Sequence, residues 1–122
     1  MSDPTFWDIK AILDWLINGS TWDTLHTYHG VNFKWSTREE LLAAVVQLNP
    51  EQCTPDRDCF RLIKPEQIGN GNGKNTYFIQ ALSNSSGVAG NGQMPYGRNE
   101  DGQYATALQL ETIIRWIDIG CP

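Results

Sequence analysis

Two amphipathic segments, one near each end of the chain, limit the folds open to this sequence. In the first, apolar residues recur at helical spacing after Asp3-Pro4, which fit an N-cap and a first helical residue, and stop near Asn18-Gly19. In the last, Thr106–Gln109 has a capping-box pattern, and Gly120 and Pro122 follow the final apolar residue. Both segments are therefore predicted to be helices. Their apolar positions are Phe6, Ile9, Ile12, Leu13, Leu16 and Ile17, and then Leu110, Ile113, Ile114, Trp116 and Ile117.

The middle of the chain predicts shorter helices between long loops. A second capping-box pattern, in which Ser36 accepts from the amide of Glu39, opens a helix that continues through Val46 and ends at Asn49-Pro50. Asn75 is expected to cap a short helix over residues 77–82. No strand pattern of convincing length is found. The prediction is an all-α fold of three to four helices with structured loops over residues 18–35, 50–75 and 83–103.

Length and charge narrow the class of protein. A chain of 122 residues is one domain of ordinary size, so residues 1–122 are expected to form a single unit. The net charge of −5 argues against nucleic-acid binding, which depends on clustered Lys and Arg. No run approaches the roughly 18 apolar residues of a membrane span. The start of the chain does not resemble a signal peptide, so the protein is expected in the cytoplasm, or as a mature periplasmic or secreted protein.

The cysteines leave two interpretations open. Cys53 and Cys59 enclose a short loop and could form one disulfide, with Cys121 left free, or all three could be free thiols. A zinc site is not expected, because three Cys and two His are too widely scattered to supply about four ligands at short spacing.

Motifs for nucleotide binding and catalysis are incomplete. The Gly- and Asn-rich stretch over residues 68–76 suggests a phosphate-binding loop, but Ile68 stands where Gly is required and Asn75 follows Lys74 in place of Ser or Thr. A turn is the better interpretation. No Ser lies in a Gly-x-Ser-x-Gly elbow, and Glu39/Glu40 are adjacent in sequence and so face different directions on a helix. The chain is therefore not expected to be an enzyme.

Several stretches of the sequence, taken in chain order, carry a resemblance to a known family. They are Asp8–Asp14, His29-Gly30, Trp35–Leu42, Leu62–Pro65, Met94–Gly97 and Ile113–Pro122. Together they resemble class I cytochrome c domains, particularly the small bacterial type, whose last helix ends in a similar Arg-Trp-Ile-Asp-x-Gly run. The resemblance covers most of the chain and is strongest in its C-terminal third. It implies a cytochrome c-like fold in which the first and last helices cross, near Ile12 and Leu13 in one and Ile113 and Ile117 in the other.

The resemblance also implies where a haem would lie. The family attaches haem through a Cys-x-x-Cys-His motif, and a Met before the last helix is the second iron ligand. Mapped here, the ligands fall on His29 and Met94, while the Cys positions fall on Leu25 and Tyr28. Neither of these can form a thioether, so covalent haem attachment by the family's route is excluded. His29 and Met94 could still ligate a haem bound without thioethers; otherwise they are a loop His and a gap-filling Met. His26 is a weaker candidate ligand.

Two functions follow from these alternatives. The first is a non-catalytic binding or assembly module without cofactor, in which bulky residues fill the volume of the missing haem and the loops present a surface to a protein partner. The second is an electron carrier whose non-covalent haem is ligated by His29 and Met94. The aromatic residues suit either a filled core or a haem pocket. They are Trp15, Trp22, Tyr28, Phe33, Trp35, Tyr77, Phe78 and Trp116. In the first alternative, Tyr28 and at least one of Trp15, Trp22 and Trp35 are expected to turn inward.

Overall fold

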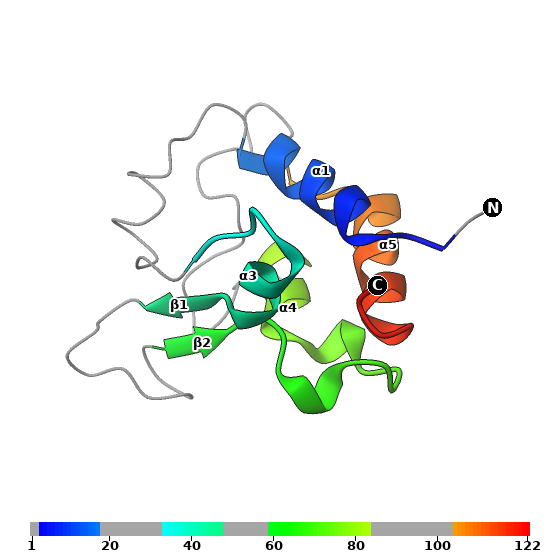
Figure 1. Ribbon diagram of the computed structural model, residues 1–122. Coiled ribbons are helices and arrows are strands. Elements are labelled where there is room, and N and C mark those ends of the chain that lie inside the picture. Colours follow the sequence, from blue (N-terminus) through cyan, green and yellow to red (C-terminus); the bar gives the residue numbers. More distant parts are fainter. Residues whose placement is uncertain (1–2, 18–32, 48–58, 84–103) are drawn as a thin grey trace.

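Helices dominate the part of the chain that the computed structural model describes, which is residues 3–17, 33–47, 59–83 and 104–122 (Figure 1). In chain order the elements are α1 (Phe6–Ile17), α3 (Arg38–Ala43), β1 (Val45–Gln47), β2 (Cys59–Arg61), the 3-10 helices η2 (Pro65–Gln67) and η3 (Gly73–Asn75), α4 (Tyr77–Ser83) and α5 (Ala107–Asp118). The predicted helical character is confirmed, but the sheet was not predicted. Among these described helices, none is long and apolar enough to cross a bilayer.

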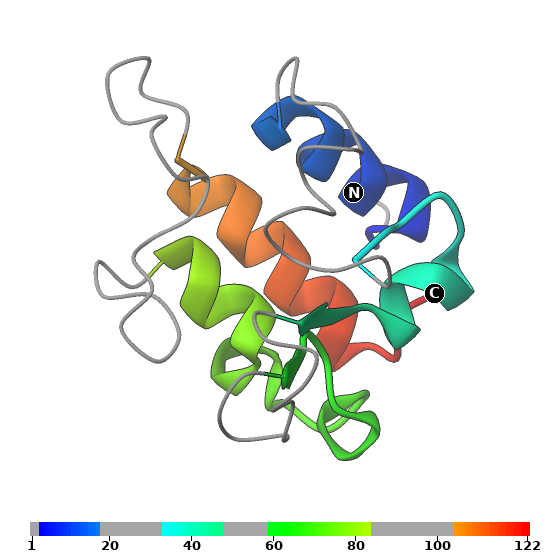
Figure 2. The same cartoon turned by 90° about the vertical axis from the view of Figure 1, so that its left-hand side faces the viewer.

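Helix α5 lies between α1 and α4 and contacts both of them (Figure 2). It runs opposite to α1, so the end of α5 lies beside the start of α1 (Figure 2). The predicted apolar faces of the two helices are confirmed, since they bury Phe6, Ile9, Leu13, Leu16, Ile113, Trp116 and Ile117, with Ile12 packed against them. The core is completed by Trp35, Leu41, Ala44, Leu62, Ile63, Phe78, Ile79, Leu82 and Cys121.

Capping side chains fix where α5 and α3 begin. The capping box of α5 is confirmed, because the Thr106 hydroxyl accepts from the Gln109 amide at 3.1 Å and the Gln109 side chain accepts from the Thr106 amide at 2.9 Å. In α3 the predicted box is one residue out of place. Thr37, not Ser36, is the N-cap and accepts from the Glu40 amide, and the Glu40 carboxylate accepts from the Ser36 amide.

The start of α1 and the capping residue of α4 also differ from the prediction, although α4 begins at Tyr77 as predicted. Helix α1 begins at Phe6, and the Asp8 carboxylate accepts from the Thr5 amide at 2.8 Å, so Asp3 is not the cap. Helix α4 is preceded by Thr76, whose buried hydroxyl accepts from the Ile79 amide and donates to a backbone carbonyl. A buried hydroxyl that makes two hydrogen bonds satisfies the helix end better than an exposed side chain at Asn75 would.

The predicted helix through Val46 is wrong, because α3 ends at Ala43 and the chain becomes extended at Ala44. Val45–Gln47 then forms β1 and pairs antiparallel with β2, with Val46 opposite Phe60. β-Branched valines favour strands over helices, and a strand of three residues is too short to show the alternation that predicts it. The Arg61 guanidinium donates to the Leu42 carbonyl at 2.8 and 3.1 Å, which satisfies the last turn of α3.

The glycine-rich stretch forms a turn that docks on α5 and not a phosphate-binding loop. The Gly69 amide donates to the Ile117 carbonyl at 2.9 Å, and the Gly73 amide donates to the Asp118 carboxylate at 2.8 Å. A Cβ at Gly73 would lie 2.9 Å from the carbonyl oxygen of Ile114, closer than packed atoms come. Glycine is therefore required at this position because η3 approaches α5 so closely.

Replacement of Ile117 by Ala tests whether the buried faces of α1 and α5 stabilise the fold. Ile117 is 0% exposed, so Ile117→Ala should lower the free energy of unfolding by roughly 2–5 kcal/mol. The matched control is Leu108→Ala on the same helix, which removes a side chain that is 73% exposed and should change stability by less than about 0.5 kcal/mol. Urea unfolding followed by circular dichroism measures both. Equal losses in the two variants would mean that the apolar faces are misassigned.

Candidate functional site

The residues that the sequence proposed as haem ligands and attachment positions lie outside the described part of the chain. These are His26, Leu25, Tyr28, His29 and Met94. Cys53 lies outside it as well, and Cys59 is described only as a backbone position in β2. The structure therefore tests neither the ligand pair nor the Cys53–Cys59 disulfide. Within the ranges that are described, no three His, Cys, Asp or Glu side chains group in a way that could hold a metal ion.

The described tryptophans divide between the core and the surface. Trp35 is buried, and its indole N–H donates to the Asp14 carboxylate at 3.0 Å, while Trp15 remains 44% exposed. Of the residues expected to turn inward, Trp35 is buried and Trp15 is not, while Trp22 and Tyr28 lie outside the described residues, so the filling of a haem volume stays a prediction. Burial raises the pKa of Asp14, but hydrogen bonds from Lys10 and Trp35 outweigh it and lower that pKa below its usual value.

The last three residues form a turn that is buried at Cys121 and that joins α1, α3 and α5. Gly120 and Cys121 both have positive φ, at 104° and 57°, which turns the chain back after α5. The Pro122 carbonyl accepts from the Phe6 amide and from the Trp116 indole, each at 2.8 Å. The Cys121 carbonyl accepts from Nε of Arg38. One donor from each of the three helices therefore ends on this turn.

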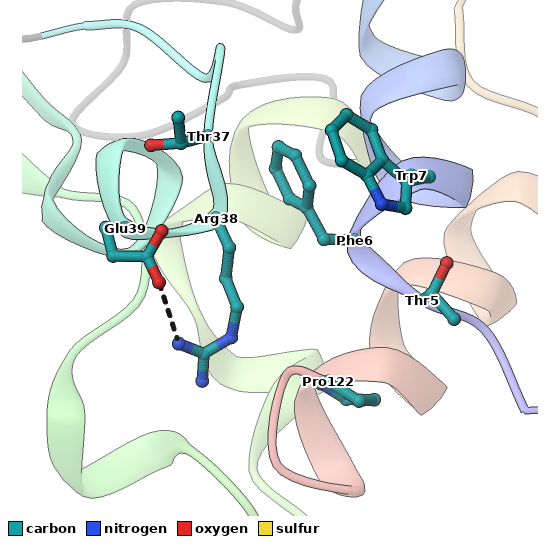
Figure 3. A pocket seen from close by; sticks show the side chains of 7 residues that line it. All are labelled: Thr5, Phe6, Trp7, Thr37, Arg38, Glu39 and Pro122. Atoms are coloured by element: carbon teal, nitrogen blue, oxygen red, sulfur yellow. Dashed lines mark ion pairs between the residues drawn. The ribbon is translucent and has the colours of Figure 1, made fainter.

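An open pocket of about 480 Å³ lies where this turn meets the starts of α1 and α3 (Figure 3). Phe6, Trp7 and Pro122 supply its apolar lining, and Arg38 lines it from α3 with its guanidinium directed away from the two rings (Figure 3). Its remaining lining residues are Thr5, Thr37 and Glu39. A concave apolar surface with a few polar groups is the usual composition of a ligand or partner site, and this volume falls within the ordinary range.

Trp7 is the most unusual of the lining residues because it is 69% exposed. Its ring meets that of Phe6 edge-on, with centroids 5.2 Å apart. Ala11 and Trp15 follow at four-residue spacing and are also exposed, so an apolar stripe continues from the pocket along the outer face of α1. Large aromatic side chains left in water beside a pocket are a common mark of an interaction surface.

Arg38 is held at the edge of the pocket by one backbone contact. Nε donates to the Cys121 carbonyl, and the acidic side chain that pairs with the guanidinium among the described residues is Glu39, whose Oε1 lies 3.7 Å from Nη1. Glu39 is far more exposed than Arg38, at 79% against 39% of the side chain. Among the described residues, none accepts a hydrogen bond from either Nη atom of Arg38, so this half of the guanidinium can bind an incoming group.

Sequence reasoning did not identify this pocket. Thr5–Trp7, Thr37–Glu39 and Pro122 come from three separate parts of the chain, and only packing of α3 on the C-terminal turn brings them together. The one available signal was the position of Trp7, which falls on the flank of the apolar stripe of α1 instead of within it.

Deprotonation of the Cys121 thiol should lower the free energy of unfolding at high pH. Burial raises the pKa of its thiol from 9.0 to about 11, although Arg38 acts in the opposite direction. Above pH 9 the unfolded chain loses this proton before the folded one does, so the free energy of unfolding should decrease by ~2 kcal/mol between about pH 9 and 11. Urea unfolding across this range should show the decrease in the wild type and a smaller one in Cys121→Ala. Identical pH profiles would contradict the burial of the thiol.

Comparison of the chain with known protein families, with curated proteins and with solved structures finds no match. The resemblance to class I cytochrome c domains therefore continues to rest on the residues that carry it. Many unrelated functions occur on all-α folds, so the architecture by itself assigns none. The pocket beside Trp7 and Arg38 is the feature of the described residues on which a function can be based.

Proposed function

We propose that this protein is a non-catalytic, cytochrome c-like binding module that carries no covalent haem and docks a protein partner at the pocket beside Trp7. The observation that carries the proposal is the 69% exposure of Trp7 at the mouth of an apolar pocket. Trp and Arg are the residue types most enriched among those that dominate binding energy at protein interfaces. Here one of each lines the same pocket.

The arrangement of the pocket supports docking more than a role in stability. The Trp7 ring buries little of its surface within the chain, so its contribution to folding is small compared with that of Trp116, which is fully buried. Covering Trp7 with a partner would remove a large apolar area from water. The Arg38 guanidinium, already oriented by the Cys121 carbonyl, would lose little conformational entropy when a partner binds.

The alternative from the same resemblance is an electron carrier with haem ligated by His29 and Met94 and bound without thioethers. The order of the ligands along the chain supports it, because the His follows the first helix and the Met precedes the last. Leu25 and Tyr28 do not fit covalent attachment, so such a haem would be held by its iron ligands and apolar contacts alone. When bound, a haem would supply one-electron transfer.

A visible spectrum separates the two functions. Protein expressed with ample haem and then purified should show no Soret band if it is the cofactor-free module that we propose. A Soret band that is retained through gel filtration, and that His29→Ala and Met94→Ala each shift or remove, would contradict the proposal and favour the electron carrier. A band that neither variant changes would be haem bound elsewhere on the protein and would not support the electron carrier.

Photo-crosslinking tests the docking site directly. A benzophenone amino acid in place of Trp7, in cells that produce the protein naturally, should give a discrete adduct with one partner protein. The matched control places the same group at Leu108, which is 73% exposed and does not line the pocket. Adducts of the same size from both positions, or none from position 7, would contradict docking at the pocket.

A further inference from the structure

We infer that the pocket selects a partner segment in which a carboxylate side chain stands next to an aromatic or aliphatic one. This inference rests on the proposed function and specifies the chemistry of the partner. The carboxylate would pair with the Nη atoms of Arg38, and the apolar side chain would lie against Trp7, Phe6 and Pro122 (Figure 3).

Arg38 carries the charge part of the inference. Its Nε bond to the Cys121 carbonyl fixes the plane of the guanidinium without neutralising it, since the acceptor is uncharged. The 3.7 Å separation between Arg38 and Glu39 is too long for a hydrogen bond. An ion pair this exposed contributes little free energy, so Glu39 competes only weakly for the guanidinium. Guanidinium groups bind carboxylates through two parallel hydrogen bonds. A carboxylate from a partner could therefore make the short contacts that Glu39 does not make.

Other acidic groups near the start of α1 already have partners in the chain. The Asp8 carboxylate accepts from Thr5, and the Asp3 carboxylate accepts from Arg115 at 2.9 Å. Their charge is therefore partly offset before a partner arrives. A cationic side chain that entered the pocket would instead meet the positive charge of Arg38. Arg38 is the cationic side chain among the residues that line the pocket, so an anionic group from a partner would find its ion-pair partner there.

The apolar part of the inference follows from the shape of the lining. Phe6 and Trp7 stand edge to face on one wall, and Pro122 closes the pocket from the C-terminal turn (Figure 3). Phe6 is itself buried, so the ring of Trp7, which is 69% exposed, offers the free aromatic surface to a further ring or to an aliphatic chain. The stripe of Trp7, Ala11 and Trp15 extends this surface along α1, which suits a peptide segment better than an isolated small acid.

Binding of matched peptides tests the inference. The probes are dye-labelled peptides of eleven residues that differ at one central position, where Glu, Gln or Lys precedes Phe and Leu in a Gly/Ser background. Fluorescence anisotropy should show that the Glu peptide binds at least tenfold more tightly than the Gln peptide, with the Lys peptide weakest. The Glu preference should also decrease as salt is raised.

Two variants test whether Arg38 causes the preference for the Glu peptide over the Gln peptide. Arg38→Gln should remove the preference for Glu over Gln, and its thermal unfolding must be measured because the contact with Cys121 is also changed. Glu39→Gln leaves that contact intact and removes the competing carboxylate, so it should tighten binding of the Glu peptide about two- to fivefold. Weaker binding to Glu39→Gln would overturn the role of Arg38 even if the Arg38 variant fails to fold.

The remaining outcomes are each decisive. Equal binding of the three peptides, or tightest binding of the Lys peptide, would overturn the carboxylate requirement. Phenylacetate that competes with the peptide at equal concentration would identify a small acid as the ligand and overturn the partner segment. If no peptide binds while the adduct at position 7 still forms, the chemistry inferred here is wrong and the docking function stands.

Discussion

The hydrogen bonds that end on the C-terminal turn align the helices of the described fold. The first amide of α1 has no acceptor within its own helix, and the Pro122 carbonyl supplies one. The same carbonyl accepts from Trp116 of α5, and the neighbouring Cys121 carbonyl accepts from Arg38 of α3. Three helices from distant parts of the sequence are thereby aligned by two adjacent backbone groups. Apolar burial supplies most of the stabilisation, but these bonds determine how the helices are placed relative to one another.

The elements that the sequence predicted well are helices with a long stripe of apolar residues and a capping side chain at the start. Helix α5 has both, with the Thr106–Gln109 box and a regular apolar stripe, and its start was placed correctly. Helix α1 has the stripe, but Asp3-Pro4 resembles a helix start and precedes the actual start at Phe6, so the predicted start was too early. The pairing of Val45–Gln47 with Cys59–Arg61 could not be predicted. A strand of three residues is too short to show an alternation of apolar and polar residues, and its partner strand is remote in sequence.

The pocket was even harder to predict from the sequence than the strand pairing. Arg38 lies in what looks like an ordinary first turn of a helix, and nothing in its neighbours indicates that its guanidinium reaches a carbonyl on the C-terminal turn, 83 positions away. Thr37 and Glu39 on either side of it have their own roles as a helix cap and a solvated charge. The cytochrome c-like resemblance directed attention to His29 and Met94, whereas the described residues place an apolar pocket at the meeting point of the helix ends.

The packing of α1 against α5 has a consequence for biosynthesis. Helix α1 leaves the ribosome well before α5, so the face that carries Phe6, Ile9 and Leu13 lacks its α5 partner until α5 has been translated. Contacts between segments so far apart in sequence form slowly, because loop closure costs conformational entropy before the contacts repay it. A nascent chain with an uncovered apolar helix is a substrate for chaperones and is prone to aggregate. The yield of folded protein in a cell should thus depend on how the incomplete chain is protected as much as on the stability of the finished one.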